Sequence, residues 1–169
     1  GANLVIVATG LLHDGDVQPE KSLRDIDADA FAKVFEVNTT GPALIAKHFL
    51  PLLPRQERGI FAALSARVGS ISDNGMGGWY AYRASKAALN MILKNASIEM
   101  GRRYKETVIV GLHPGTVDTG LSEPFQGNVP EGKLFDAAYS TAQMLNVLDG
   151  LTSEHSGKIF DYKNEEIEP

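Results

Sequence analysis

Apolar residues gather in four short runs, and between these runs they recur every three or four positions. The runs are NLVIVAT at 3–9, GIFAALSA at 59–66, ETVIVGLHP at 106–114 and GKIFDY at 157–162. Short runs rich in β-branched residues are typical of strands buried on both faces of a parallel sheet. We therefore predict four strands at these positions.

The longest segment with helical spacing covers residues 27–53. Its apolar positions follow a period near 3.6, at Phe31, Val34, Phe35, Ile45, Phe49 and Leu50. Gly41 and Pro42 interrupt the segment, and proline lacks the N–H that a continuous helix needs. We therefore expect a kink at these two residues.

Two further helices are predicted, over residues 79–102 and 133–148. Residues 118–132 are rich in Gly, Pro and Ser, and we expect them to form a long mobile loop. The predicted order is β-α-β-α-β-α-β. This alternation favours the α/β class, as a Rossmann-like parallel sheet with flanking helices and right-handed crossovers. Residues 1–169 contain no repeat and no linker, so we expect a single domain.

Composition narrows the possible functions. The net charge of -5 leaves no basic surface for nucleic acid or an anionic membrane. The chain has no cysteine and no apolar run near the roughly 20 residues that span a bilayer. Its histidines lack metal-ligand spacing, so no metal site is expected: they are His13, His48, His113 and His155. These features, and the lack of a signal-peptide pattern, favour a cytoplasmic protein.

The candidate catalytic residues lie in the segment GGWYAYRASKAALN at 77–90. Tyr82 and Lys86 are four residues apart, so they share one face of the predicted helix. A positive charge at about 4 Å, in an effective dielectric of about 20, contributes roughly 4 kcal/mol toward ionising a phenol whose pKa is otherwise near 10. The pair is thus a candidate general acid and base. The alternative is a buried tyrosine near an unrelated surface lysine.

The surrounding segment, SARVGSISDNGMGGWYAYRASKAALN, resembles the active-site region of short-chain dehydrogenases/reductases, in particular the C-factor-like and sniffer-like carbonyl reductases. Other landmarks follow in the family's order. VATG at 7–10 is similar to its NNAG strand end, with Val7 and Ala8 in place of both asparagines. EVNTTGP at 36–42 resembles its mid-helix asparagine motif, and HPGTVDTG at 113–120 its PGxVxT segment. The resemblance extends over residues 4–162.

This resemblance implies a set of catalytic roles. Tyr82 would exchange a proton with the alcohol or carbonyl oxygen. Lys86 would lower the pKa of Tyr82 and hydrogen-bond the nicotinamide ribose, and Asn38 would hold a water in a proton relay. The residues implied to contact NAD or NADP are Ala8, Gly10, Tyr82, Lys86, Pro114, Gly115, Val117 and Thr119.

The chain departs from the family at the serine that steadies the substrate oxygen. That serine normally stands three residues before the loop glycine, which is Gly69 here, and Ala66 occupies the position. Ser65 precedes it and points to the other side of an extended strand. Ser70 follows Gly69 on the loop that leads to the site. Either hydroxyl could serve, and the sequence does not decide between them.

A second departure concerns the cofactor. Dinucleotide-binding sheets carry a Gly-rich phosphate loop in their first βα turn, and these 169 residues contain no equivalent. GMGG at 75–78 precedes the catalytic helix and does not follow a strand. The resemblance therefore implies that the chain starts at the fourth strand of the family's sheet.

The sequence thus predicts an NAD(P)-dependent oxidoreductase that interconverts a carbonyl and an alcohol by hydride transfer. The alternative is a cofactor-free truncated relative, a pseudoenzyme that acts as a dimerisation or regulatory module. A homodimer or tetramer that assembles through residues 27–53 and 79–102 is implied in either case. A small carbonyl or alcohol substrate is expected, whereas the choice of substrate and of NAD or NADP cannot be read from the sequence.

Overall fold

A four-stranded parallel sheet forms the centre of the molecule in a computed structural model that describes all 169 residues. The strands stand in the order β1-β2-β3-β6 and are β1 (Leu4–Val7), β2 (Gly59–Leu64), β3 (Thr107–His113) and β6 (Ile159–Asp161). All neighbouring pairs are parallel. The predicted α/β class, with a Rossmann-like parallel sheet, is confirmed, and each predicted strand is present, two or three residues shorter than expected.

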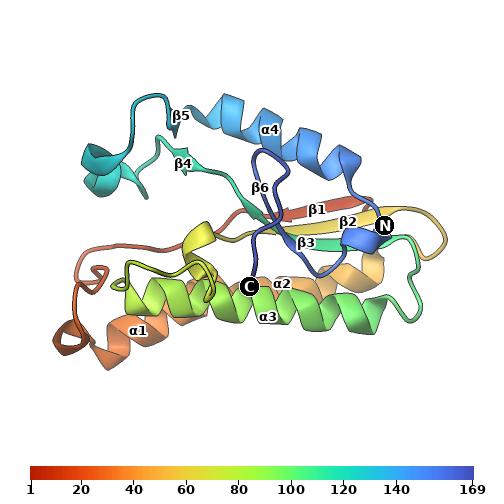
Figure 1. Ribbon diagram of the computed structural model, residues 1–169. Helices are drawn as coiled ribbons and strands as arrows, with labels where there is room; N and C mark the ends of the chain where they lie inside the picture. The colour runs from red at the N-terminus through yellow and green to blue at the C-terminus, as the bar shows by residue number, and fades with distance from the viewer.

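Helices cover both faces of this sheet. They are α1 (Ala28–Phe35), α2 (Gly41–Phe49), α3 (Tyr80–Met100) and α4 (Ala137–Gly150). The first three lie on one face, and α4 lies on the other (Figure 1). Short 3-10 helices connect these elements, at Leu23–Asp25, Leu50–Leu52, Arg67–Gly69, Glu123–Asn128 and Ser153–His155.

Alternate residues of the strands pack against different helices. Along β3, Ile109 faces the layer of α2 and α3, where it joins a buried cluster with Phe61 and Leu89. Val108 and Val110 face the other way and pack with α4. This two-residue period is what a strand buried on both faces requires.

The first long helical segment is interrupted earlier than expected. The predicted kink at Gly41 and Pro42 is replaced by a turn of π-helix at Glu36–Thr40, after which α2 begins at Gly41. Pro42 has no N–H to donate to the Asn38 carbonyl, its partner in a regular α-helix. The chain inserts an extra residue into the preceding turn, so that Gly41 N–H donates to Glu36 O.

A short parallel ribbon encloses residues 118–132, the region predicted as a mobile loop. The ribbon pairs β4 (Thr116–Val117), just before this region, with β5 (Leu134–Phe135), just after it, and the 3-10 helix Glu123–Asn128 lies between them. Because β5 occupies the start of the predicted helix at 133–148, α4 begins only at Ala137, where the Asp136 side chain caps it by accepting from Tyr139 N–H at 2.7 Å.

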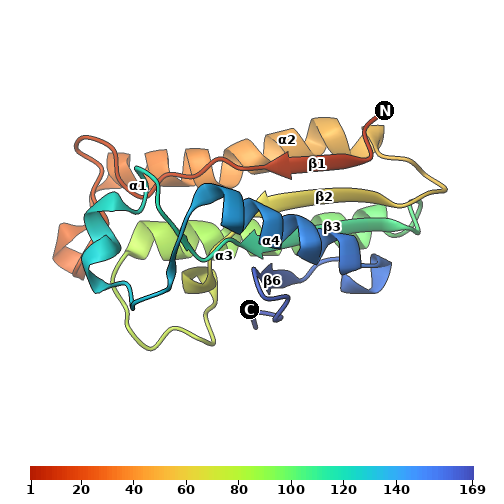
Figure 2. The ribbon, with the colours of Figure 1, turned by 90° about the horizontal axis from the view of Figure 1, so that it is seen from above.

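The outer strand β1 lies at the edge of the sheet, seen from above in Figure 2. Two of its side chains remain exposed, Leu4 at 44% and Ile6 at 41%. None of the helices combines the length and the apolar character needed to cross a membrane.

Candidate active site

The helix α3, which carries Tyr82 and Lys86, begins at an unusual backbone turn. Gly77, Gly78 and Trp79 all have positive φ, at 67°, 67° and 51°. The Trp79 N–H donates to Glu20 O at 2.5 Å, and the buried Glu20 carboxylate accepts from Ala81 N–H at 3.1 Å. A carboxylate at a helix N-terminus is favoured by the helix dipole. This turn therefore sets the start of α3 and places Tyr82 in its first turn.

Tyr82 and Lys86 lie together on α3. The Lys86 Nζ is 5.7 Å from the Tyr82 ring centroid and donates a hydrogen bond to Leu64 O at 2.7 Å. The lysine is therefore buried, not on the surface.

The electrostatics of the pair are dominated by burial. Burial raises the pKa of Tyr82 to about 12 and lowers the pKa of Lys86 to about 8. The sequence-based expectation that Lys86 lowers the pKa of Tyr82 is therefore not met in this structure. The phenol keeps its proton at neutral pH and can act as a proton donor.

The loop after β2 is pressed against Lys86. A Cβ on Gly69 would lie 2.7 Å from the Lys86 Cβ and 3.1 Å from the Lys86 carbonyl carbon. Only a residue without a side chain allows this approach. Gly69 thus fixes the position of the loop that carries Ser70.

Asn38 is fully buried and joins three segments of the site. Its amide exchanges hydrogen bonds with the Leu11 backbone, at 2.7 Å from Leu11 N–H and 2.8 Å to Leu11 O. It also donates to Ser85 Oγ at 3.1 Å. A Cβ on Gly10 would lie 3.8 Å from Lys86 Nζ and 3.9 Å from Asn38 Oδ1. The structure therefore brings Asn38, Gly10 and Lys86 together, with no direct bond between Asn38 and Lys86.

The two candidate serines have different surroundings. Ser65 donates to Asn90 Oδ1 at 2.6 Å. Asn90 stands four residues after Lys86 and eight after Tyr82, roughly 6 and 12 Å further along α3. The Ser65 hydroxyl is therefore bonded to a side chain beyond both residues. Ser70 is buried and accepts from Asp73 N–H at 3.1 Å, and its hydroxyl hydrogen has no acceptor in the structure. Ala66 occupies the strand end between them.

The segment expected to contact the nicotinamide leads from β3 into β4. Pro114 O accepts from Ser140 Oγ at 2.8 Å, and Gly115 adopts a positive φ of 78°. Val117 O accepts from Ser122 Oγ at 2.5 Å and from Thr119 Oγ1 at 3.4 Å. These bonds fix the backbone of the segment. Ala8 and Gly10, at the end of β1, are both exposed.

An aromatic group beside Tyr82 was missed by sequence reasoning. The Trp79 ring meets Tyr82 edge-on at 6.2 Å and Phe125 at 5.1 Å. Phe125 also contacts the His13 ring, with ring centroids 5.7 Å apart, and His13 Nε2 lies 2.9 Å from Gly120 O. Only the contact between Trp79 and Tyr82 could have been expected from the sequence, because these residues are three positions apart. Phe125 and His13 come from distant loops, so no sequence pattern connects them to this group.

Comparisons with known proteins agree with this geometry. The pattern that defines the short chain dehydrogenase family matches residues 3–129. The chain is 39% identical to the C-signal of Myxococcus xanthus over 146 residues, which cover 86% of this chain and 82% of that protein. It is 35% identical to 1-hydroxy-2-glutathionyl-2-methyl-3-butene dehydrogenase of Rhodococcus sp. (strain AD45), over 79% of this chain and 56% of that enzyme.

Solved structures show the same fold. The carbonyl reductase Sniffer of D. melanogaster superposes with a TM-score of 0.83 at 25% identity, over 99% of this chain and 66% of that one. The NADPH-bound carbonyl reductase from chicken fatty liver superposes with a TM-score of 0.84 at 26% identity, over 100% of this chain and 66% of that one. The chain thus spans slightly less than two thirds of these two reductases.

Proposed function

The chain belongs to the short chain dehydrogenase family, and from that premise we propose that it is an NAD(P)-dependent oxidoreductase that interconverts a carbonyl and an alcohol. The observation that carries the proposal is the buried pair on α3. A protonated phenol with an ammonium 5.7 Å from its ring is the group that acid catalysis at a carbonyl oxygen requires.

In the reductive direction, Tyr82 donates its phenolic proton to the carbonyl oxygen. The negative charge left on the Tyr82 oxygen is stabilised by the Lys86 ammonium, since opposite charges attract strongly at a site with little water. A nicotinamide cofactor, when bound, supplies the hydride for the carbonyl carbon. In the oxidative direction the alcohol proton returns to Tyr82.

The residues in front of Lys86 fit a nicotinamide ribose. Lys86 uses one of its three ammonium hydrogens on Leu64 O, so two remain for ribose hydroxyls. Gly10 lies directly before the ammonium, since a Cβ there would be in van der Waals contact with Lys86 Nζ at 3.8 Å. We propose that the backbone contacts of the cofactor come from Ala8, Gly10, Pro114, Gly115, Val117 and Thr119. The carbonyl reductase from chicken fatty liver, described as NADPH-bound, supports a nicotinamide cofactor.

We assign the steadying of the substrate oxygen to Ser70. Its hydroxyl hydrogen is free, whereas that of Ser65 is bonded to Asn90. Ser70 also directly follows Gly69, the residue packed on Lys86. Asn38 is proposed to hold a water that relays protons to Lys86, beside which it lies.

Self-association is proposed through the layer of α2 and α3. Several large apolar side chains of these helices are exposed, among them Leu44 at 51%, Met91 at 61% and Ile98 at 52%. Burial of such residues favours association by roughly 25 cal/mol per Å² of apolar area. The cytoplasmic location that the composition favours stays a prediction.

The proposed activity is tested by carbonyl-dependent oxidation of NADH and NADPH by the natural gene product, measured with a panel of aldehydes and ketones. Lys86→Ala is expected to lower kcat and to raise the KM for the cofactor, since it removes both the stabilising charge and the ribose contact. The proposal is contradicted if no carbonyl compound is reduced with either cofactor, or if Lys86→Ala leaves the KM for the cofactor unchanged. The alternative of a cofactor-free module predicts no oxidation at all.

A further inference from the structure

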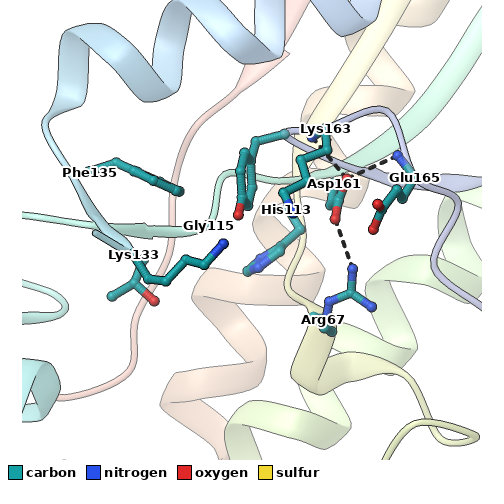
Figure 3. Close-up of a pocket in the computed structure, with 10 residues that line it drawn as sticks. Arg67, His113, Gly115, Lys133, Phe135, Asp161, Lys163 and Glu165 are labelled. Atoms are coloured by element: carbon teal, nitrogen blue, oxygen red, sulfur yellow. Dashed lines mark hydrogen bonds and ion pairs between the residues drawn. The ribbon is translucent and has the colours of Figure 1, made fainter. Parts of the chain in front are cut away.

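A cavity lies where β3 and β6 end. It has a volume of about 270 Å³ and takes its lining from four separate parts of the chain (Figure 3). The charged, imidazole and aromatic side chains that line it include Arg67, His113, Lys133, Phe135, Asp161 and Tyr162. Neither Tyr82 nor Lys86 lines it. The cavity is therefore a place where a ligand can bind without touching the catalytic pair.

One wall is an aromatic pair packed over a glycine. Phe135 and Tyr162 meet with ring centroids 4.7 Å apart at 65°. A Cβ on Gly115 would lie 2.6 Å from the Phe135 ring and 3.1 Å from Tyr162 Cδ1, and Gly115 also has a positive φ of 78°. Only glycine allows these rings to close over the backbone. The wall is thus a fixed apolar surface.

The carboxylate of Asp161 in this cavity is already satisfied. Its Oδ2 pairs with Arg67 Nη2 at 2.8 Å, and its Oδ1 accepts from the backbone N–H groups of Lys163 and Glu165, at 2.9 and 3.0 Å. Asp161 therefore presents no free charge to a ligand.

Lys133, in contrast, has no carboxylate within ion-pair distance. Its ammonium reaches across the cavity toward the His113 ring (Figure 3). Lys163 is likewise unpaired, with its ammonium 5.8 Å from the Tyr162 ring centroid, and Glu165 is the one lining carboxylate without a cationic partner. Positive charge is thus in excess in the cavity, although the whole chain carries a net charge of -5.

The imidazole ring of His113 also lines the cavity, and it makes no hydrogen bond within the protein. Its Nδ1 is buried and has no hydrogen-bond partner. Burial, with the nearby charge of Arg67, lowers the pKa of His113 to about 4, against the opposing effect of Asp161. The ring is therefore neutral at pH 7 and carries one N–H and one lone pair. Because Nδ1 is enclosed by the protein, Nε2 is the ring nitrogen that can meet a ligand in the cavity.

We propose that this cavity binds a small organic carboxylate. The anionic group lies between the Lys133 ammonium and the edge of the His113 ring, and the apolar part rests against Phe135 and Tyr162. Because the Glu165 carboxylate offsets the charge of Lys163, the net positive charge that remains is that of Lys133, which matches a singly charged group. The volume is at the low end for ligand sites, so the ligand has about the size of a benzoate ion.

The test is a calorimetric titration of the natural gene product with sodium benzoate, in the absence of any nicotinamide cofactor. Saturable binding is expected, and Lys133→Gln is expected to weaken it at least about tenfold, because a charge-assisted hydrogen bond is lost. Lys47→Gln, which changes an exposed lysine of α2, is the matched control and should bind benzoate as the wild type does. Benzamide, a neutral compound of similar shape, should also bind at least about tenfold more weakly.

The proposal is overturned by the lack of saturable benzoate binding, or by equal affinities in wild type and Lys133→Gln. Tyr82→Phe should bind benzoate unchanged, since Tyr82 does not line the cavity. Loss of binding in Tyr82→Phe would place the ligand at the catalytic pair instead and would also overturn the proposal. Because this measurement uses no cofactor and no turnover, its result is independent of the proposed oxidoreductase activity.

Discussion

The Lys86 ammonium lies 5.7 Å from the centre of the Tyr82 ring and is bonded to Leu64 O at 2.7 Å. The lysine is thus held by a strand on one side and faces the phenol on the other. Both groups are buried, which raises the pKa of Tyr82 to about 12 and lowers the pKa of Lys86 to about 8. A proton donor and a nearby cation are therefore fixed in place before any substrate binds.

The buried lysine gives the stability of the protein a specific pH dependence. The pKa of Lys86 is about 8 in the folded protein and 10.5 ordinarily, so the unfolded chain binds more protons between these values. The free energy of unfolding should therefore rise by about 2–3 kcal/mol from pH 8 to pH 10, relative to a Lys86→Met variant. Urea unfolding of both proteins across this range measures the difference. Parallel pH curves for the two proteins would contradict the assignment.

Ser65 and Ser70 are expected to differ in what they contribute. Ser65→Ala removes the bond to Asn90 and should lower the free energy of unfolding by about 1 kcal/mol while turnover persists. Ser70→Ala should lower turnover by on the order of 10²–10³, because it removes the donor assigned to the substrate oxygen. Steady-state kinetics with urea unfolding separates the two effects. Unchanged turnover in Ser70→Ala would show that another donor, or a water, steadies the oxygen.

Gly69→Ala should disturb the site although it adds a single methyl group. The added Cβ would lie 2.7 Å from the Lys86 Cβ, so the loop or α3 must shift, at a cost of about 1–3 kcal/mol and with a loss of activity. Gly75→Ala, on the same loop, meets nothing within 4 Å and serves as the control. Equal stability and equal kcat in the two variants would show that the contact with Lys86 is unimportant.

The 169-residue chain by itself should bind NADH and NADPH weakly and should self-associate. It contains no Gly-rich turn to hold the pyrophosphate at a helix N-terminus, so only the nicotinamide-side contacts are available. The edge strand β1 exposes Leu4 and Ile6, and an apolar edge is a template for pairing with another chain. Calorimetric titration and light scattering test both parts. A monodisperse monomer with micromolar cofactor affinity would contradict the prediction.

The parts of the fold set by local sequence were predictable. Runs such as NLVIVAT and TVIVGL identify strands of a parallel sheet, because β-branched residues without polar alternation must be covered on both faces. The four-residue spacing of Tyr82 and Lys86 placed them on one face of α3, as the structure shows.

The remaining features depend on contacts between distant segments. The β4–β5 ribbon consists of two-residue strands, too short for a periodic signal. The contact of Phe125 with Trp79 joins two loops that no pattern connects. Whether the pKa of Tyr82 is raised or lowered depends on how completely other elements bury the phenol. The sequence showed only that a lysine lies nearby, and a nearby lysine by itself would lower this pKa.

Tyr82 is the residue proposed to transfer the proton in carbonyl reduction. Tyr82→Phe removes the phenolic oxygen and keeps almost all of the ring volume, so the fold and the cofactor affinity should be nearly unchanged. The decisive measurement is kcat for carbonyl reduction by the natural gene product at saturating cofactor, for wild type and Tyr82→Phe. We expect Tyr82→Phe to lower kcat at least about 10²-fold and to leave the Kd for the cofactor unchanged. Turnover within a few-fold of the wild type would contradict it.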